Sequence, residues 1–388
     1  YNGKKINILN KVNEILKQIP SIEKTIVFPY SQKEKTEIKN FIDFDQVIDN
    51  SNLDETFERF DFDHPIYILF SSGTTGKPKC ITHGAGNVLI EHNKEFMLHC
   101  DIRDKEKLFY YTTTGWMMWN WLVGGLATGS SIFLFDGAPT YPKIDILLKY
   151  CHDKKINLFG VSAKYIDHLK NENFNSKHLD LSSIKIITST GSPLAEESFK
   201  YIYKNIKKDV HLASIAGGTD MVGCLVLGNL YSNVYAGEIQ GQSLAIDVDV
   251  FSDHGKSIKE GEKGELVVKQ PFPSMPVKFW GDDNGEKYHK AYFTKFKNIW
   301  HHGDFIEKTS NNGFIMRGRS DATLNPGGVR IGTSEIYQQV EDIDFITEGL
   351  VVGQDYKDDV RIILFVTTKE NKELDDEKLK LIKTRIRK

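Results

Sequence analysis

One run of nine residues combines the side chains that phosphate binding requires. Residues 71–79 read Ser-Ser-Gly-Thr-Thr-Gly-Lys-Pro-Lys and directly follow the short apolar stretch 66–70. Two glycines permit tight backbone turns, hydroxyl and backbone N–H groups can surround phosphate oxygens, and the lysines add positive charge. The spacing differs from that of the common nucleotide loop G-x-x-x-x-G-K-[ST]. We therefore predict a distinct phosphate-binding loop, formed by Ser72, Gly73, Thr74, Thr75, Gly76 and Lys77.

Further strings of small and polar residues follow in order along the chain. Gly191-Ser192-Pro193 comes after a strand predicted at residues 184–189, and residues 214–220 (Ser-Ile-Ala-Gly-Gly-Thr-Asp) come after another. His302-Gly303-Asp304 comes later. An aspartate after glycine is usually a turn residue, so each string alone indicates little. The remaining strings are Gly264-Glu265-Leu266, residues 318–321 and residues 325–336.

In this order the motifs resemble those of the adenylate-forming acyl-CoA synthetase superfamily. Residues 115–121, 188–194 and 322–330 narrow the resemblance to members that activate acetoacetate. The resemblance implies ATP-dependent ligation of acetoacetate to coenzyme A. An acyl-adenylate would form first, and the products would be acetoacetyl-CoA, AMP and pyrophosphate. The resemblance is strongest from Asp61 onward, where its motifs follow one another closely.

The resemblance also implies roles for single residues, which suit a reaction between an anionic carboxylate and an anionic triphosphate. Thr219 would contact the α-phosphate, and Asp220 would hold the Mg²⁺ that bridges phosphate oxygens. Asp304 would accept both ribose hydroxyls. Arg319 and Arg330 would offset phosphate charge. The predicted catalytic residues are Thr219, Asp220 and Arg330. The other predicted ATP or AMP contacts are Gly191, Ser192, Pro193, Ser214, Ile215, Ala216, Gly217 and Gly218.

Side-chain volumes indicate where the acyl group would bind. Acetate-specific relatives carry tryptophan at the position of Gly217, so glycine would leave space for a longer acid. Met118 would be an adaptable wall, and Thr190 could donate to the 3-keto oxygen. This fits acetoacetate without excluding butyrate or a branched short acid. The pocket residues are Trp116, Met117, Met118, Thr190 and Gly217, whereas Trp119 and Trp121 are expected to pack in a core or interface.

The C-terminal part departs from the pattern of the superfamily. Gly327 and Gly328 are predicted to line the coenzyme A tunnel, with a hinge at Asp321. The catalytic lysine of the superfamily, which sits in a Gly-Lys pair, is not found, so we expect a fragment lacking both ends and inactive in adenylation. Two alternatives are another short- or medium-chain acyl-CoA ligase and a non-catalytic nucleotide-binding module.

Alternating strands and helices must position these strings, which favours an α/β fold with a largely parallel sheet. We expect a large adenylate-forming domain at residues 1–320, antiparallel in texture after residue 245, and a small mobile α+β domain at 321–388. Strands are predicted at residues 25–29, 66–70, 130–135, 158–162, 184–189, 211–215, 245–251, 264–269, 349–352 and 361–368. Helices are predicted at residues 6–16, 87–99, 144–154, 163–170, 196–204 and 375–387.

Composition narrows the class of protein. The 388 residues carry a net charge of −3, which gives no electrostatic footprint for nucleic acid. The longest apolar runs have about five residues, too short for membrane insertion. Four cysteines lie far apart without a CxxC pair, so we expect a reducing, cytoplasmic location. The histidines show no metal-ligand spacing. The expected partners are small molecules, and the oligomeric state is left open.

Overall fold

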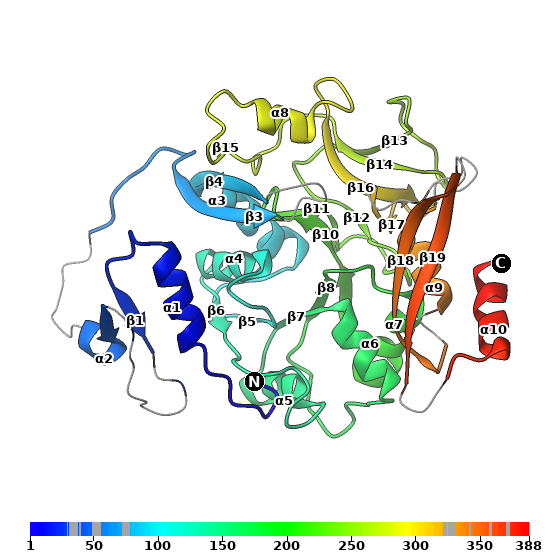
Figure 1. Cartoon of the computed structure of the whole chain (residues 1–388), viewed down its shortest axis with the longest axis horizontal. Helices are drawn as coiled ribbons and strands as arrows, with labels where there is room; N and C mark the ends of the chain where they lie inside the picture. Colours follow the sequence, from blue (N-terminus) through cyan, green and yellow to red (C-terminus); the bar gives the residue numbers. More distant parts are fainter. Residues whose placement is uncertain are drawn as a thin grey trace.

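The computed structural model describes most of the chain. The described residues are 1–28, 30, 38, 40–48, 56–71, 78–320, 324, 331–340, 343–356, 359–369 and 373–387. Figure 1 shows a central body of strands and helices, with the N-terminal elements on one side and the C-terminal elements on the other.

A five-stranded sheet lies in the middle of this body (Figure 1). Its strand order is β6-β5-β7-β8-β9, and every neighbouring pair is parallel. The predicted parallel sheet is therefore confirmed. Strand β5 adds to the predicted set, because polar residues before it obscure its short apolar run. The strands are β5 (Lys107–Tyr110), β6 (Ser131–Phe133), β7 (Leu158–Ser162), β8 (Ile186–Thr190) and β9 (His211–Ser214).

Side chains of this sheet alternate between two hydrophobic cores, as successive residues of a strand must. Phe109 and Phe159 enter one core, which α5, α6 and α7 cover. Leu108 and Leu158 enter the other, which contains side chains of α4 and η1. The sheet is thus buried on both faces, which is typical of parallel sheets. The helices are α4 (Met117–Gly124), α5 (Ile146–Lys154), α6 (Ala163–Asn171), α7 (Glu196–Tyr201) and the π-helix η1 (Glu95–His99).

The helix predicted at residues 87–99 is present but changes type along its length. It begins as α3 (Ala85–Lys94) and continues as the π-helix η1. The helix predicted at residues 196–204 likewise continues past α7 as a second π-helix, η3 (Ile202–Ile206). The sequence pattern predicts helix in both places, but the shift to i→i+5 hydrogen bonds is a finding of the structure.

Antiparallel sheets lie beside the parallel one, as predicted for the region after residue 245. The largest has the order β13-β14-β16-β17. Two three-stranded sheets have the orders β10-β11-β12 and β15-β4-β3. Their elements are β3 (Pro65–Ser71), β4 (Lys79–Gly84), β10 (Ala216–Gly218), β11 (Gly223–Leu227), β12 (Gly241–Gln242), β13 (Val248–Phe251), β14 (Lys263–Val268), β15 (Lys278–Phe279), β16 (Trp300–Lys308), β17 (Phe314–Arg319) and helix α8 (Glu286–Tyr292).

The C-terminal residues form an α+β unit with its own apolar clusters. Val340, Ile346 and Ile382 are buried together in one of them. An ion pair between Lys263 of β14 and Glu335 of α9 joins this unit to the preceding sheet. The domain boundary at residue 320 stays a prediction. The elements are α9 (Thr333–Val340), β18 (Ile346–Tyr356), β19 (Asp359–Thr368) and α10 (Asp376–Ile386).

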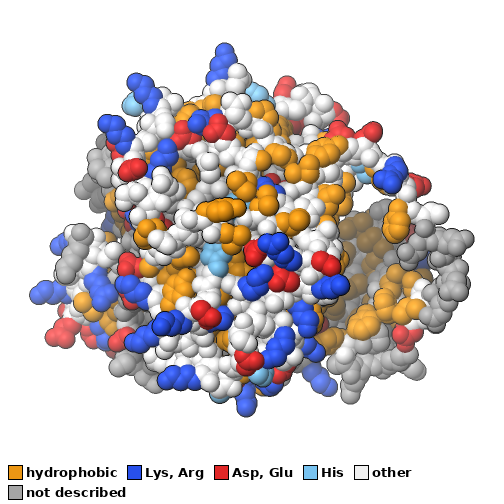
Figure 2. All heavy atoms as spheres, turned by 180° about the vertical axis from the view of Figure 1, so that it is seen from behind, with side chains coloured by type: hydrophobic (Ala, Val, Ile, Leu, Met, Phe, Trp, Pro, Cys, Tyr) orange, Lys and Arg blue, Asp and Glu red, His pale blue; other side chains and the backbone are white. Residues whose placement is uncertain are grey.

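The N-terminal elements are α1 (Leu9–Gln18) and a parallel pair, β1 (Thr25–Val27) with β2 (Phe41–Asp43), followed by α2 (Phe44–Val47). Seen from behind, they stand at the right of the molecule, beside a hollow in the surface (Figure 2). Basic and acidic side chains are intermixed over the face shown there. Within the described part of the chain, no helix is long and apolar enough to cross a membrane.

Candidate active site

A cavity of about 270 Å³ opens where β8 and β9 end at their carboxyl termini. Ligand sites of open parallel sheets lie at this edge. Apart from Asp220, all predicted site residues that the structure describes line this cavity. They are Trp116, Met117, Met118, Thr190, Gly191, Ser192, Pro193, Ser214, Ile215, Ala216, Gly217, Gly218, Thr219, Asp304 and Arg319.

Other predicted site residues lie outside the described residues. On either side of residues 72–77 the chain is described, and Ser71 of β3 pairs with Lys79 of β4 in an antiparallel ladder. Lys79 therefore lies close to the predicted phosphate loop in the chain, and its ammonium group contacts Asp220 next to the cavity. The predicted residues outside the described part are Ser72, Gly73, Thr74, Thr75, Gly76, Lys77, Asp321, Gly327, Gly328 and Arg330.

The turn after β8 needs glycine. Gly191 has a φ of +91°, in the region that side chains other than glycine rarely adopt. A Cβ at this position would lie 3.5 Å from the indole of Trp116. A Cβ would therefore make ordinary contact with the ring, and the positive φ is what requires glycine. Gly191, Ser192, Pro193 and Trp116 all line the cavity.

Asp304 and Arg319 face each other across the ladder of β16 and β17. The guanidinium of Arg319 donates from Nη1 to Asp304 Oδ1 over 3.0 Å, and His302 Nε2 lies 3.5 Å from Asp304 Oδ2. The Asp304 side chain is nearly buried, whereas that of Arg319 is 52% exposed. The carboxylate is therefore fixed in place at the cavity wall, while the guanidinium remains accessible.

Asp220 does not line the cavity, and one of its two carboxylate oxygens accepts two hydrogen bonds. Lys79 Nζ and the Tyr292 hydroxyl both donate to Oδ1, over 2.5 and 2.6 Å. Burial by itself raises the pKa of Asp220, but Lys79 and the other nearby donors hold it below its ordinary value. The other oxygen, Oδ2, would lie 3.4 Å from a Cβ at Gly218, which lines the cavity.

The volume argument for Gly217 needs correction. A Cβ at Gly217 would lie 2.0 Å from the carbonyl oxygen of Gly223 in the paired strand β11. The strand register shifts between Ala216 and Gly217, and this irregularity brings the two backbones together. A side chain at position 217 would thus meet β11 first, and glycine is required there by the close backbone approach.

The predicted role of Thr190 also changes. Its hydroxyl donates to the carbonyl oxygen of Ile215 over 2.8 Å. The proton expected to bind a 3-keto oxygen is therefore already used inside the protein. Thr190 instead ties the end of β8 to the end of β9, at the rim of the cavity.

Several residues that shape the site were not found by sequence motifs. His83 donates from Nε2 to the carbonyl oxygen of Thr219 over 2.9 Å, and burial lowers its pKa to about 4. Tyr292 stacks on Trp300 with 3.6 Å between ring centroids, which fixes its hydroxyl on Asp220. Lys79 differs from these two, because its positive charge was already part of the prediction for residues 71–79. No sequence pattern links Tyr292 to Asp220.

A second, larger cavity of about 1010 Å³ lies elsewhere in the described structure. Gln240, Lys308 and Phe314 contribute to its walls, but none of the predicted site residues does. Volume alone would favour it. We assign the chemistry to the smaller cavity because charged groups and glycine turns from separate strands converge there.

Comparison with known proteins agrees with this assignment. The family model for AMP-binding enzymes matches residues 3–275. The acetoacetyl-coenzyme A synthetase of Rhizobium meliloti (strain 1021) is 50% identical over 394 residues, covering 100% of this chain and 60% of that protein. The Gallus gallus acetoacetyl-CoA synthetase is 42% identical over 398 residues, with the same coverage.

A solved structure extends the likeness to three dimensions. Acetoacetyl-CoA synthetase from Streptomyces lividans matches with a TM-score of 0.91 and 37% identity, over 100% of this chain and 59% of that one. The predicted adenylate-forming α/β fold is thereby confirmed. The chain spans about 60% of the length of the curated relatives it matches.

Proposed function

The chain belongs to the AMP-binding enzyme family, and we propose that it carries the nucleotide and acyl sites of an acetoacetate–CoA ligase. The observation that carries this proposal is the convergence of the predicted residues on one cavity at the carboxyl ends of β8 and β9. The motifs were chosen from sequence alone, and residues more than 200 positions apart meet there.

In the first step, a carboxylate oxygen of acetoacetate attacks the α-phosphorus of ATP, and the bond to pyrophosphate breaks. Gly191, Ser192 and Pro193 would bound the adenine, and Asp304 would accept hydrogen bonds from the ribose hydroxyls. Thr219 would meet the α-phosphate. Arg319, half exposed beside Asp304, would offset the negative charge that gathers as the two anions approach.

Mg²⁺ fits this arrangement as a cation held mainly by substrate. No group of three or more His, Cys, Asp or Glu side chains in the described chain could hold a metal by itself. Mg²⁺ commonly binds one or two carboxylates together with substrate phosphates. Asp220 would offer Oδ2, because Lys79 and Tyr292 already occupy Oδ1. When bound, the ion would neutralise phosphate charge.

The acyl group would occupy the apolar end of the cavity, between Trp116, Met117 and Met118 on one side and the Gly217 backbone on the other. In the second step, the thiol of coenzyme A displaces AMP from the acyl-adenylate and forms the thioester. We propose the sites for this step at Gly327 and Gly328, with Arg330 on the phosphate and a hinge at Asp321 between domains 1–320 and 321–388. These residues lie outside the described part.

A cytoplasmic location completes the proposal. All four cysteines, in the described part of the chain, are free thiols, which suits a reducing compartment.

The test is acid-dependent release of pyrophosphate from ATP, measured with acetoacetate, acetate and butyrate in parallel. It uses the chain completed by the segment that carries the Gly-Lys pair, because the given chain is expected to be inactive in adenylation. We expect the largest kcat/KM with acetoacetate and no release without ATP. Equal rates with butyrate would point to a general short-chain ligase. ATP binding without release for any acid would leave only a nucleotide-binding module.

A further inference from the structure

One fully buried carboxyl group joins two walls of the cavity without touching the cavity itself. Glu95 has no exposed surface. Its Oε1 accepts from the backbone N–H of Cys224 over 2.6 Å, and its Oε2 accepts from the indole Nε1 of Trp121 over 2.6 Å. Cys224 belongs to β11 and Trp121 to α4. The carboxyl group of Glu95 therefore links a strand to a helix that lies far from it in sequence.

Both linked elements contribute side chains or backbone to the cavity. Met118, three residues before Trp121 on α4, lines it, and residues three apart on a helix share one face. Cys224 lines it as well and pairs with Gly217 in the β10–β11 ladder. Moving α4 relative to β11 would thus move Met118 relative to Gly217. The distance between these two walls decides how large an acid fits.

Neighbouring side chains hold Glu95 in place. Glu91 and Lys94 share its helix face, and both are buried. Lys94 Nζ donates to Glu91 Oε1 over 2.8 Å and to Ser243 Oγ over 2.6 Å. The ammonium group thus ties the Glu91 carboxylate to the Ser243 hydroxyl. Burial, followed by the Glu91 carboxylate, raises the pKa of Glu95 to about 8, so Glu95 is a neutral acid near neutral pH.

The start of β11 is fastened by the same helix. Val222 has a φ of +53°, a costly conformation for a β-branched residue. His92 Nε2 donates to the Val222 carbonyl oxygen over 2.7 Å and lies against Gly124 of α4, where a Cβ would be 2.0 Å from His92 Nδ1. A Cβ at Gly223 would be 2.7 Å from Glu91. The helices α3 and α4 and the strand β11 are therefore closely packed against one another.

We propose that Glu95 is a positioning residue that sets the width of the acyl cavity and thereby its selectivity among short carboxylic acids. It acts through Trp121 and Cys224 and does not touch the acid. The proposal rests on the proposed function, since it assigns the acyl group to this cavity.

The decisive variant is Glu95→Gln. Glutamine keeps the shape of the side chain but has a single carboxamide oxygen, so its NH₂ group must face either the Cys224 N–H or the Trp121 N–H. One buried donor then lacks an acceptor. We expect KM for acetoacetate to rise about tenfold, because losing one of the two bonds lets α4 and β11 shift at the cavity walls that would hold the acyl group. We expect kcat and KM for ATP to stay within about twofold, and the preference for acetoacetate over butyrate to fall.

Two further variants separate positioning from general damage. Trp121→Phe removes the indole donor together with part of the buried ring volume, and we expect it to raise KM for acetoacetate in the same direction. Glu106→Gln is the matched control, because Glu106 also accepts from two donors, the Arg103 N–H and Lys185 Nζ, but at the other end of the sheet. It should leave both KM values unchanged.

Two results would overturn the proposal. One is a folded Glu95→Gln enzyme whose KM for acetoacetate and selectivity are unchanged. The other is a variant in which KM for the acid and KM for ATP rise, and kcat falls, all by the same factor. If the wild type activates no acid, the proposed function fails separately. Hydrogen exchange of the Trp121 indole N–H and the Cys224 backbone N–H then tests the link through Glu95. Both should exchange slowly in the wild type and in Glu106→Gln, and one of the two should exchange faster in Glu95→Gln. Equal exchange of both groups in all three proteins would refute the link.

Discussion

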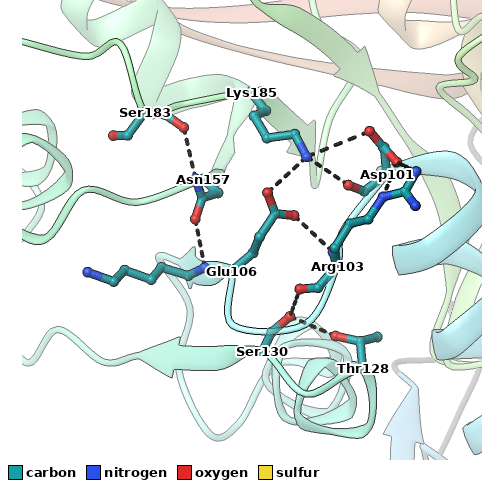
Figure 3. A network of polar contacts seen from close by, with 9 residues as sticks. Asp101, Arg103, Glu106, Thr128, Ser130, Asn157, Ser183 and Lys185 are labelled. Carbon is teal, nitrogen blue, oxygen red and sulfur yellow. Dashed lines mark hydrogen bonds and ion pairs between the residues drawn. The ribbon is translucent and has the colours of Figure 1, made fainter.

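The two ends of the parallel sheet use polar residues in opposite ways. At the amino end, Lys185 Nζ donates to Glu106 over 2.9 Å and to the Asp101 carbonyl oxygen over 2.9 Å, and Asn157 links the Lys107 N–H to the Ser183 carbonyl oxygen (Figure 3). These groups precede β5, β7 and β8 and pair with one another. Their charges are satisfied within the protein, at a partly exposed surface.

At the carboxyl end, the chain instead leaves space. Glycines and small residues follow β8 and β9, and charged groups border a cavity there. Asp304 and Arg319 line it, and Asp220 lies beside its lining residue Gly218. The comparison shows that the same residue types pair with one another at one end of the sheet and border a cavity at the other. The predictions below test this difference.

The largest effect is expected from Asp304→Ala. Two ribose hydroxyls would each lose a charge-assisted hydrogen bond worth about 1.5–3 kcal/mol, so ATP affinity should fall by at least about a hundredfold. The fold should persist, because the freed Arg319 side chain is already half exposed. Isothermal titration with ATP and a melting curve measure both. An unchanged affinity, or loss of the fold, would remove Asp304 from the nucleotide site.

The next effect concerns the close approach of β10 and β11. Gly217→Ala places a Cβ 2.0 Å from a backbone oxygen, so stability should fall by about 1–3 kcal/mol. Gly218→Ala is the control, because the nearest atom to its Cβ would lie at 3.4 Å. Urea unfolding of both variants compares them. Equal midpoints would mean that the bulge at Gly217 is not as tight as described.

A smaller effect should appear in the pH dependence of stability. The folded protein keeps a proton on Glu95 up to about pH 8, whereas the unfolded chain releases it near 4.5. The folded state therefore binds more protons in this window, and the contribution of Glu95 to stability falls as pH rises through it. Glu91, Lys94 and Cys224 face Glu95 and remain in every variant.

Unfolding in urea at pH 6 and pH 8 tests this dependence. The loss of stability between the two values should be smaller in Glu95→Gln than in the wild type. The buried His83 and His92 have pKa values near 4, so their contribution to the stability of the folded protein increases with pH up to the ordinary pKa of histidine. This contribution is the same in the variant and in the wild type, so it cancels in the comparison. Identical slopes would show that Glu95 is already ionised at pH 6.

The smallest effect is expected at the amino end. Glu106→Gln removes the charge that pairs with Lys185, whose side chain is 38% exposed. Partly exposed ion pairs contribute about 0–1 kcal/mol, so the melting temperature should change little and ATP affinity not at all. A loss of ATP affinity in this variant would break the distinction between the two ends.

The sequence predicted the elements that carry strong local patterns. β7 occupies residues 158–162, as predicted, because a compact apolar run is bounded by polar residues. The motifs after β8 and β9 lie together because the carboxyl ends of these parallel strands meet at one edge, whereas Asp304 and Arg319 reach the cavity from the antiparallel pair β16 and β17. Most of the cavity lining could therefore be predicted from local strings.

What could not be predicted depends on contacts between distant residues. Glu91, Lys94 and Glu95 are spaced as an exposed helix face would be, and their burial follows only from α4 and from β11, which lies 129 residues beyond Glu95. The direction of a Cβ at Gly217 depends on a bulge that no spacing encodes. Residue types indicated the chemistry, while tertiary contacts decide which atoms remain free for it.

The most direct test of the central claim is a crystal structure with AMP. We predict the adenine beside Gly191, Ser192 and Pro193, with the ribose hydroxyls on Asp304, in the cavity at the carboxyl ends of β8 and β9. AMP bound instead in the larger cavity near Gln240 and Lys308 would contradict the account.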